Sequence, residues 1–588
     1  MKNLIYIYMF ILSLGVIVTS CDLDAPSKSA AEGSVVLSIE ALAEGAVMGI
    51  HQSFGETNSY RGRFLPYYGI NSDVEWINGI DPTQLNDAGK YELSTYAASP
   101  GNTQMNTDNN AWAKFYEGIE RANKAIEGLR AYGNVAENPR MAQLLGEALT
   151  LRAVIYLDLV KAWGDVPARF EPITTETLYL PRSDRDVIYK QLLADLDEAE
   201  ELVAWPNETD ITASTERVNK SFVKGLMARI ALYAGGYSQR ADGVRRSNDP
   251  ELSPEKMYAL AKEKTTEVIQ EGYNKLGSFE DNFRLLCQDD VTAGKESLWE
   301  IPFSAGRGRV LFTLGVQHRA IDQYTGQNRG GTNGPLPYLF YDYDVEDLRR
   351  DVTCVPYEWS NANPSHQQLR RISNWCFGKL RYEWMNRYVT STNDDGINWQ
   401  YMRLADVYLM AAEAINELEG PSAAAPYLKP VLDRVLPSEK VTAYMAQVTA
   451  SKSTFFNAIV DQRALEFAGE SLRKADLIRW NLLKTKLDEA KVKMTQLINR
   501  EGNYADLPEK LYYKLADDNE TLIIYGLNHG DTDAIGAGLN YESNVTWFNN
   551  SHLSSELINA LYQKDPNQNQ FWPIWQTFID SSNGQLTN

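Results

Sequence analysis

The chain has 588 residues, of which 78 are acidic and 57 are basic, so its formal net charge is −21. A chain this acidic is repelled by nucleic acid and by anionic lipid headgroups, which excludes both as main partners. It has only five histidines, scattered singly, and four cysteines, so neither a zinc-ligand spacing nor a disulfide framework is present.

The first twenty residues have the pattern of a secretory signal peptide. Lys2 precedes an apolar run over residues 4–18, which is shorter than the roughly 20 residues of a membrane-spanning helix. The segment Val18-Thr19-Ser20-Cys21 that follows resembles a bacterial lipobox, in which the cysteine is acylated. We therefore expect cleavage after residue 20 and a lipid anchor on Cys21, since several acyl chains hold a protein firmly to a bilayer. An ordinary secreted protein with a free cysteine is the alternative.

The first helical signal follows Asp108-Asn109-Asn110, which can cap a helix. Apolar residues recur at three- and four-residue steps from Trp112 to Leu129. A second pattern over residues 141–159 runs to Gly164-Asp165-Val166-Pro167, where glycine and then proline end a helix. Two helices paired across a short turn are predicted. Similar patterns recur over residues 188–202, 222–233, 258–269, 402–418, 423–435 and 456–468.

Paired helices of this length resemble tetratricopeptide units, which bury their faces by stacking on neighbours, although no clean 34-residue period is present. The fold class predicted is predominantly α, a tetratricopeptide-like scaffold of helical hairpins with a loop-rich, partly β face for ligand. Helical repeats are expected at about 108–270 and 400–480, and loop-rich insertions at about 55–107 and 272–399. Because no linker divides the chain, we expect one body over residues 21–588.

Three cysteines remain after the predicted cleavage, Cys287, Cys354 and Cys376. At most one bridge can form among them, and Cys354 and Cys376 flank a segment that could double back. We favour buried free thiols over that bridge.

Several segments together resemble the SusD/RagB family. Residues 152–167 look like a helix that ends in the family's turn of an aromatic residue followed by Gly-Asp-Val-Pro, and residues 403–414 look like its second signature helix. Residues 463–480 are similar to the third, and Trp572-Pro573-Ile574 matches the closing segment. The resemblance extends over nearly the whole chain.

This resemblance implies an outer-membrane nutrient-binding lipoprotein without catalytic activity or cofactor. Its helical scaffold would meet a SusC-like TonB-dependent transporter, over which it acts as a lid, and its loop-rich face would hold a glycan, or in some members a peptide. Asp22 and Asp24 follow Cys21 closely, as acidic residues do in lipoproteins exported to the outer surface of bacteria that carry this family. In some other Gram-negative bacteria, an aspartate after the cysteine instead retains the protein at the inner membrane.

Charged residues inside the signature helices are interpreted as structural ties, because a buried charge persists only when it is paired or hydrogen-bonded. They are Arg152, Asp158, Asp406, Glu413, Arg463, Glu466, Arg473 and Asp476.

Candidate ligand contacts come from two loop segments, residues 67–76 and 307–343. Sugars present apolar C–H faces and a rim of hydroxyls, so a site needs exposed rings with fixed amides, carboxylates or arginines. The candidates are Tyr67, Asp73, Trp76, Tyr324, Asn328, Arg329, Asn333 and Tyr338. We expect Trp76 to expose a stacking ring and Trp163 to lie in the core.

Other functions are less favoured. A secreted glycoside hydrolase needs two carboxylates about 5–10 Å apart, and 78 acidic residues supply too many pairs to single one out. A pure protein-binding scaffold would not need the loop-rich half. Oxygen ligands that could hold a structural Ca²⁺ cluster in two short segments, Asp531-Thr532-Asp533 and Asn393-Asp394-Asp395-Gly396. Neither segment has the twelve-residue spacing of an EF-hand, so we favour solvated turns.

Overall fold

The structure, a computed structural model, describes residues 33–79, 89–390, 395–549 and 551–588. The predicted signal peptide and the lipidation of Cys21 lie outside the described residues and stay predictions. Within the described ranges, no helix is both long and apolar enough to cross a membrane.

The first helical group consists of helices that pack on their neighbours in chain order. Asn110 caps the helix that begins at Ala111 by accepting a hydrogen bond from the Ala113 N–H at 3.2 Å. The next helix ends at Gly164, whose φ of 71° only glycine adopts without strain. The group contains α3 (Glu40–Gly55), α5 (Ala111–Tyr132), α6 (Pro139–Trp163), α7 (Arg185–Leu202), α8 (Lys220–Ala234) and α9 (Pro254–Glu271).

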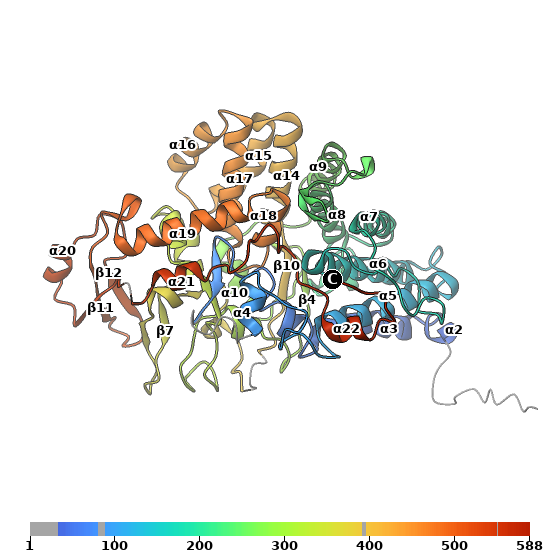
Figure 1. Cartoon of the computed structure of the whole chain (residues 1–588), viewed down its shortest axis with the longest axis horizontal. Coiled ribbons are helices and arrows are strands. Elements are labelled where there is room, and N and C mark those ends of the chain that lie inside the picture. The colour runs from blue at the N-terminus through green and yellow to red at the C-terminus, as the bar shows by residue number, and fades with distance from the viewer. Residues whose placement is uncertain (1–32, 80–88, 391–394, 550) are drawn as a thin grey trace, which may run out of the picture.

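A second helical group follows the loop-rich middle of the chain. Its first helix, α14, packs against both α15 and α9, so the two groups form one continuous scaffold. Figure 1 shows α14 to α17 at the top beside α8 and α9. The group contains α14 (Leu404–Glu419), α15 (Pro421–Asp433), α16 (Ser438–Val448), α17 (Lys452–Phe467), α18 (Arg473–Arg479) and α19 (Leu483–Asn499). The predicted helical hairpins are therefore confirmed, whereas α3, α16 and α19 were not predicted.

Short helices and small antiparallel sheets make up the remainder, and loops of the middle segment project from the lower edge in Figure 1. The helices are α2 (Gly33–Val36), α4 (Gly89–Ser94), α10 (Phe279–Cys287), α11 (Val310–Leu314), α12 (Leu339–Asp342), α13 (Arg349–Thr353), α20 (Asp533–Gly538), α21 (Ser555–Asn559) and α22 (Gln576–Asp580). The predominantly α fold with a partly β, loop-rich part is thus confirmed.

The strands pair segments that are distant in the chain. β1 (Glu75–Ile77) pairs with β5 (Asn333–Pro335), and β4 (Ser297–Ile301) pairs with β10 (Trp399–Arg403). The other strands are β2 (Ser238–Arg240), β3 (Gly243–Arg245), β6 (Cys354–Val355), β7 (Tyr357–Trp359), β8 (Gln367–Leu369), β9 (Cys376–Phe377), β11 (Lys510–Leu515), β12 (Leu522–Tyr525) and β13 (Ser543–Thr546). The sheet β12-β11-β13 lies beyond the ranges predicted to be rich in loops.

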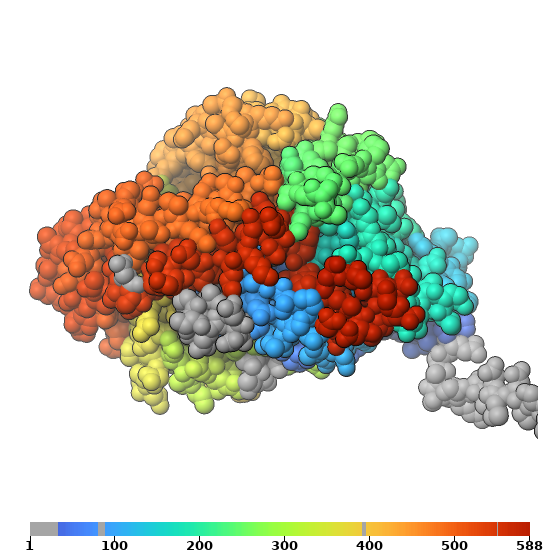
Figure 2. Space-filling model, in the orientation of Figure 1, coloured from blue at the N-terminus to red at the C-terminus, as the bar shows by residue number. Residues whose placement is uncertain are grey.

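The C-terminal segment returns to the start of the chain. The Trp572 indole donates to the Leu93 carbonyl at 3.1 Å, and the Gln563 N–H donates to the Thr95 carbonyl at 2.9 Å. Figure 2 shows this red segment lying beside the blue N-terminal surface. Trp163 is 4% exposed and its ring lies 5.4 Å from that of Trp572, so its predicted place in the core is confirmed.

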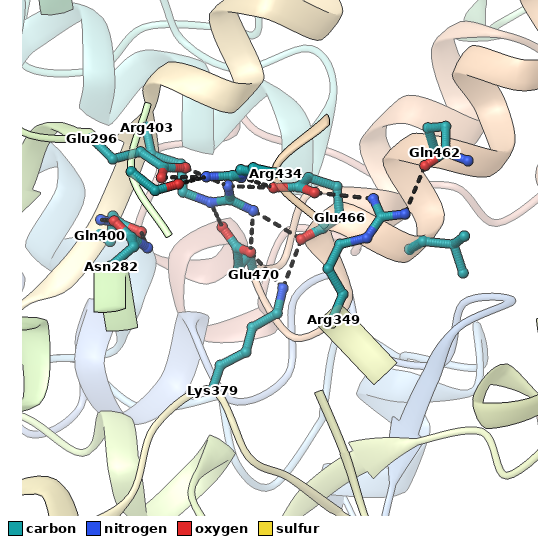
Figure 3. A network of polar contacts seen from close by, with 12 residues as sticks. Asn282, Glu296, Arg349, Lys379, Gln400, Arg403, Arg434, Gln462, Glu466 and Glu470 are labelled. Atoms are coloured by element: carbon teal, nitrogen blue, oxygen red, sulfur yellow. Dashed lines mark hydrogen bonds and ion pairs between the residues drawn. The ribbon is translucent and has the colours of Figure 1, made fainter. Parts of the chain in front are cut away.

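Buried ion pairs tie the helices together, as the charged signature residues predicted. Arg403 binds Glu296 at 2.8 Å and Glu466 at 2.7 Å, and Figure 3 shows these side chains within one network. Arg463 bridges two other helices by binding Asp406 at 2.6 Å and Asp476 at 2.7 Å. The remaining signature charges are paired too: Arg152 with Asp195, Asp158 with Lys161, Glu413 with Arg479, and Arg473 with Asp73.

The cysteines within the described residues, Cys287, Cys354 and Cys376, are buried and free. Cys354 and Cys376 lie in the paired strands β6 and β9 without a bridge. Burial raises the pKa of the Cys287 thiol to about 12, so it stays protonated and unreactive. The preferred prediction of free thiols is confirmed.

Candidate functional site

The predicted site residues do not converge on one surface. Four of them lie where β1 meets β5, namely Asp73, Trp76, Asn333 and Tyr338. Three lie on the loop after His318, namely Tyr324, Asn328 and Arg329. The eighth, Tyr67, is half-buried against the core.

Trp76 does not expose a stacking ring, so that expectation was wrong. It pairs with Gly334 across the β1–β5 ladder and is 1% exposed. Its strand partner is itself closely packed, because a Cβ at Gly334 would lie 1.9 Å from the Trp375 carbonyl oxygen. Asn333 is also buried, and its amide donates to the Pro66 carbonyl at 3.0 Å. Both residues serve the strand pairing.

Asp73 and Tyr338 do meet, at a cleft of about 280 Å³ between α12, α17 and α19. The Tyr338 hydroxyl donates to the Asp73 carbonyl, and Arg473 binds the Asp73 carboxylate. The Lys493 ammonium lies 4.9 Å from the Tyr338 ring and binds Asp342 at 2.7 Å. Asp73 and Asp342 are therefore paired with basic side chains, and a lysine occupies the face of the buried Tyr338 ring, so a sugar has little to stack on.

An exposed tyrosine, Tyr388, lies on the loop-rich part of the molecule. Tyr388 is 49% exposed, and its hydroxyl donates to the Asp322 backbone carbonyl at 3.0 Å. The ring lies over Gly326, where an added Cβ would be 3.4 Å from it. The Gly326 N–H donates to the Val389 carbonyl at 2.9 Å, which joins the two loops. The ring is thus both accessible and held in place.

Tyr324 and Asn328 belong to the same pair of loops. The half-buried Tyr324 packs 4.8 Å from the Trp359 ring. Burial and the carboxylate of Glu520 raise the pKa of Tyr324 to about 12, so its hydroxyl stays protonated and donates to Glu520 at 3.1 Å. Asn328 is exposed; its side-chain oxygen accepts from Gln317 at 2.8 Å, and its amide nitrogen donates to none of the described residues. Ile321, which precedes Asp322 in this loop, is exposed as well. We name Ile321, Tyr324, Asn328 and Tyr388 the tyrosine platform.

The platform rests on a buried histidine and the aspartate that binds it. His318 is 0% exposed, and its Nδ1 lies 2.6 Å from an Asp322 carboxylate oxygen. Burial disfavours the imidazolium, but the carboxylates of Asp322 and Glu383 outweigh it and raise the pKa of His318. The other Asp322 oxygen accepts from the backbone N–H groups of Tyr324 and Thr325 at 2.8 and 2.9 Å. Asp322 therefore fixes the loop that carries Tyr324 and also anchors Tyr388.

Arg329 is not on this surface. It is 1% exposed, and its guanidinium lies 5.7 Å from the buried ring of Tyr382. Tyr388, in contrast, was not singled out from the sequence, although it belongs to the aromatic-rich segment expected to form loops. Its signal could have been found, since the polar residues Asn386, Arg387 and Thr390 lie close to this aromatic residue in the sequence.

The carboxylates proposed for Ca²⁺ are bound by backbone amides. Asp395 accepts from the Leu311 N–H at 3.0 Å, Asp531 from the Asn528 N–H at 2.9 Å, and Asp533 from the Glu509 N–H at 2.8 Å. Across the described ranges, no three His, Cys, Asp or Glu side chains cluster as metal ligands. Asp395 is buried and Asp533 begins α20, so the solvated turns expected at these two residues were wrong. Asn393 and Asp394 lie outside the described residues.

Comparison with known proteins identifies the family. The model of the SusD family matches residues 295–588, half of the chain. The chain belongs to the SusD family. A second model, described as starch-binding associating with outer membrane, matches residues 68–232 of this SusD-family protein.

Relatives share the fold of this SusD-family protein at low identity. SusD-like protein P25 of Formosa agariphila is 23% identical over 481 residues, which cover 74% of this chain and 82% of the relative. A SusD homolog from Bacteroides thetaiotaomicron superposes with a TM-score of 0.71 at 17% identity, covering 94% of this chain and 97% of that chain. Surface glycan-binding protein A from the same organism, solved in complex with laminarihexaose, superposes with a TM-score of 0.60 at 18% identity. The match covers 93% of this chain and 98% of that chain.

Proposed function

We propose that this SusD-family protein binds an oligosaccharide at the tyrosine platform, on the outer surface of the cell. The observation that carries the proposal is the Tyr388 ring, which is 49% exposed yet held by its hydrogen bond to Asp322. A ring fixed in this way stacks on a sugar at little entropic cost, because few rotamers are lost on binding. The similar fold of a protein solved with laminarihexaose supports a glycan as the ligand.

Delivery to a SusC-like TonB-dependent transporter is the second part of the proposal. It follows from family membership and from the predicted lipid on Cys21, which would hold the protein at the outer membrane. The family description of association with the outer membrane supports this location. Pull-down with the lipoprotein as bait tests the partner, and absence of the transporter from the captured material would contradict it. Protease treatment of intact cells tests the location, and digestion only after lysis would contradict surface exposure.

The protein is proposed to bind its ligand without cleaving it. The carboxylates nearest the platform have structural partners: Asp322 binds His318, and Glu520 accepts from Tyr324. A glycoside hydrolase instead needs one carboxyl as an acid and a second as a base or nucleophile. Incubation with a panel of glycans tests this point, because steady release of new reducing ends would contradict a binding-only role.

A peptide ligand remains the alternative within the family. Titration of the chain that starts at residue 22 with neutral oligosaccharides and with peptides separates the two. We expect saturable binding of an oligosaccharide, and binding of peptides alone would contradict the glycan assignment.

A further inference from the structure

One loop, residues 318–329, carries three of the four residues of the tyrosine platform, and we name it the His318 loop. His318 closes it at its base, because the His318 N–H donates to the Arg329 carbonyl at 2.7 Å and the Arg329 N–H donates to the His318 carbonyl at 3.0 Å. The fourth platform residue, Tyr388, is bound to the same loop through the backbone carbonyl of Asp322. The groups that hold this loop therefore hold the whole platform.

The imidazole of His318 is fixed among aromatic rings. It stacks on Trp359, with ring centroids 5.7 Å apart and planes inclined by 17°, and it meets Tyr382 edge to face at 5.3 Å. Because His318 is fully buried, its ring nitrogens depend on protein partners rather than on bulk water.

Two carboxylates face the two nitrogens of this ring. Nδ1 lies 2.6 Å from an Asp322 oxygen, and Nε2 lies 3.7 Å from a Glu383 oxygen. No other side chain among the described residues forms an ion pair with either carboxylate. Burial opposes the ionisation of Glu383, but His318 and Arg381 outweigh it and lower the pKa of that carboxyl. A charged imidazole directs one N–H toward each carboxylate.

A neutral imidazole cannot serve both carboxylates. It keeps a proton on only one nitrogen, and the other nitrogen then presents a lone pair. With the proton on Nδ1 the lone pair faces Glu383, and with the proton on Nε2 it faces Asp322. Either tautomer leaves one buried carboxylate without a close cationic partner, which costs free energy. Loss of the proton therefore destabilises the cluster in which Asp322 binds the backbone N–H groups of Tyr324 and Thr325.

Other ionisable groups surround the ring, but the imidazole is the one suited to titrate near neutral pH. Histidine is the only side-chain type in this cluster that ordinarily titrates between about pH 5 and 8. Burial raises the pKa of the neighbouring Tyr324, Tyr357 and Tyr382 hydroxyls, so these stay protonated. The remaining charged side chains have partners other than the imidazole: Arg329 lies over Tyr382, Arg381 binds Tyr357, Glu520 accepts from Tyr324, and Arg319 pairs with Glu358.

We propose that His318 is a positioning residue: its charged ring holds the tyrosine platform in the binding conformation, so that affinity for glycan falls when the ring loses its proton. This role depends on the glycan function proposed above for the platform. A loop that is already ordered loses little entropy on binding, whereas a loosened loop must be ordered by the ligand, which costs affinity.

The direction of the pH dependence follows from the two carboxylates. Burial disfavours the imidazolium, but Asp322 and Glu383 outweigh it and raise the pKa of His318 above the usual 6.5. The stabilisation that the charged ring provides is therefore complete below about pH 6.5 and is lost as the pH rises through the raised pKa. Glycan should accordingly bind more tightly at about pH 6 than at about pH 9.

Calorimetric titration of the chain from residue 22 with laminarihexaose and other neutral oligosaccharides, over a series from about pH 6 to pH 9, tests this role. We expect the affinity of the wild type to fall at least about fivefold across the series. His318→Gln, which cannot gain a charge but can still hydrogen-bond, should bind weakly at every pH. Glu75 and Glu300 titrate in both proteins, so the difference between the two profiles reports His318.

His529→Gln is the matched control. The His529 ring also lies 2.8 Å from an aspartate, Asp506, but this pair is about half exposed and lies outside the platform. The variant should keep the pH dependence of the wild type. Glu383→Gln removes one of the two carboxylates that favour the charged His318 ring, so the fall in affinity should move to lower pH. If His318→Gln does not fold, this shift decides instead.

Hydrogen exchange reports on the loop without glycan. Protection of a peptide that spans residues 319–329, corrected for the intrinsic effect of pH, should fall from about pH 6 to pH 9 in the wild type and in His529→Gln but not in His318→Gln. Unchanged protection in the wild type overturns the proposal, as does glycan affinity that is independent of pH or falls equally in wild type and His318→Gln. These results leave the function of the platform intact. Absence of binding by every oligosaccharide at every pH overturns that function and this role together.

Discussion

The guanidinium of Arg473 donates two hydrogen bonds of 2.7 Å to the carboxylate of Asp73, although 400 positions separate them in the chain. Arg473 also donates to the Val460 carbonyl at 2.7 Å, and both charged side chains are buried. The pair ties the loop before β1 to the second helical group. Asp73 therefore contributes to the fold through this buried ion pair.

Replacement of Asp73 by alanine should lower the free energy of unfolding by about 3–5 kcal/mol, because it leaves the Arg473 guanidinium buried without its partner. Urea unfolding followed by circular dichroism measures the change. Asp342→Ala is the matched control, since its pair with Lys493 is partly exposed and should contribute at most about 1 kcal/mol. If Asp73→Ala unfolds like the wild type but loses glycan binding, Asp73 is a ligand contact after all.

Truncation of Trp76 should affect stability rather than binding. Its ring is fully enclosed, so Trp76→Ala opens a cavity and should lower the free energy of unfolding by about 3–5 kcal/mol. Glycan affinity measured below the melting temperature should stay that of the wild type. A variant with normal stability and weakened binding would show that this ring becomes exposed to ligand.

Tyr388 should behave in the opposite way. Tyr388→Ala removes the exposed ring of the tyrosine platform and should weaken oligosaccharide binding by about 1–2 kcal/mol, or roughly five- to thirty-fold. Because the ring is half exposed, the free energy of unfolding should change by less than about 1 kcal/mol. Tyr388→Phe keeps the ring and loses only the hydrogen bond to Asp322. Its affinity for the oligosaccharide should therefore lie between that of the wild type and that of Tyr388→Ala.

Glu75 makes stability depend on pH. Burial raises its pKa to about 8 from an ordinary 4.5, against the opposing effects of the Gly469 N–H and Lys379. The folded chain therefore binds this proton more tightly than the unfolded chain does, and the stabilisation is complete below about pH 4.5 and lost as the pH rises through about 8.

Glu75→Gln removes this titration while keeping a similar shape. Between pH 5 and 8 the free energy of unfolding, measured by urea, should fall less for the variant than for the wild type. The difference between the two falls should be on the order of a few kcal/mol. Glu300 shifts in the same direction and is present in both proteins, so the difference between the curves reports Glu75. Parallel curves for the two proteins would contradict the assignment.

The helices could be predicted because their signals are local. Asn110 begins α5 and Gly164 ends α6 through contacts within a few residues, and the apolar spacing between them needs no knowledge of the partner helix. The missed helix α3 carried the same signal, since Ala43, Val47, Ile50 and Phe54 recur at three- and four-residue steps and are all buried.

The ligand-binding residues could not be predicted in the same way, because segments distant in the sequence decide whether a loop side chain is exposed. Trp76 is covered by a strand 258 residues later in the chain, and nothing in residues 67–76 reveals that pairing. Tyr388 is exposed because its loop pairs with the loop of Gly326, which only the folded chain shows. The fold class therefore followed from the sequence, whereas of the residues named for the site only Tyr324 and Asn328 lie on the platform.

Calorimetric titration of the chain from residue 22 with laminarihexaose and a panel of other neutral oligosaccharides, for wild type and Tyr388→Ala side by side, tests the central claim most directly. We expect at least one oligosaccharide to bind with a Kd in the micromolar-to-millimolar range, corresponding to about −8 to −4 kcal/mol. Its affinity should fall at least fivefold in Tyr388→Ala, with no new reducing ends in either sample. Equal affinity in the two proteins, or no binding by any oligosaccharide of the panel, would contradict a glycan site at the tyrosine platform.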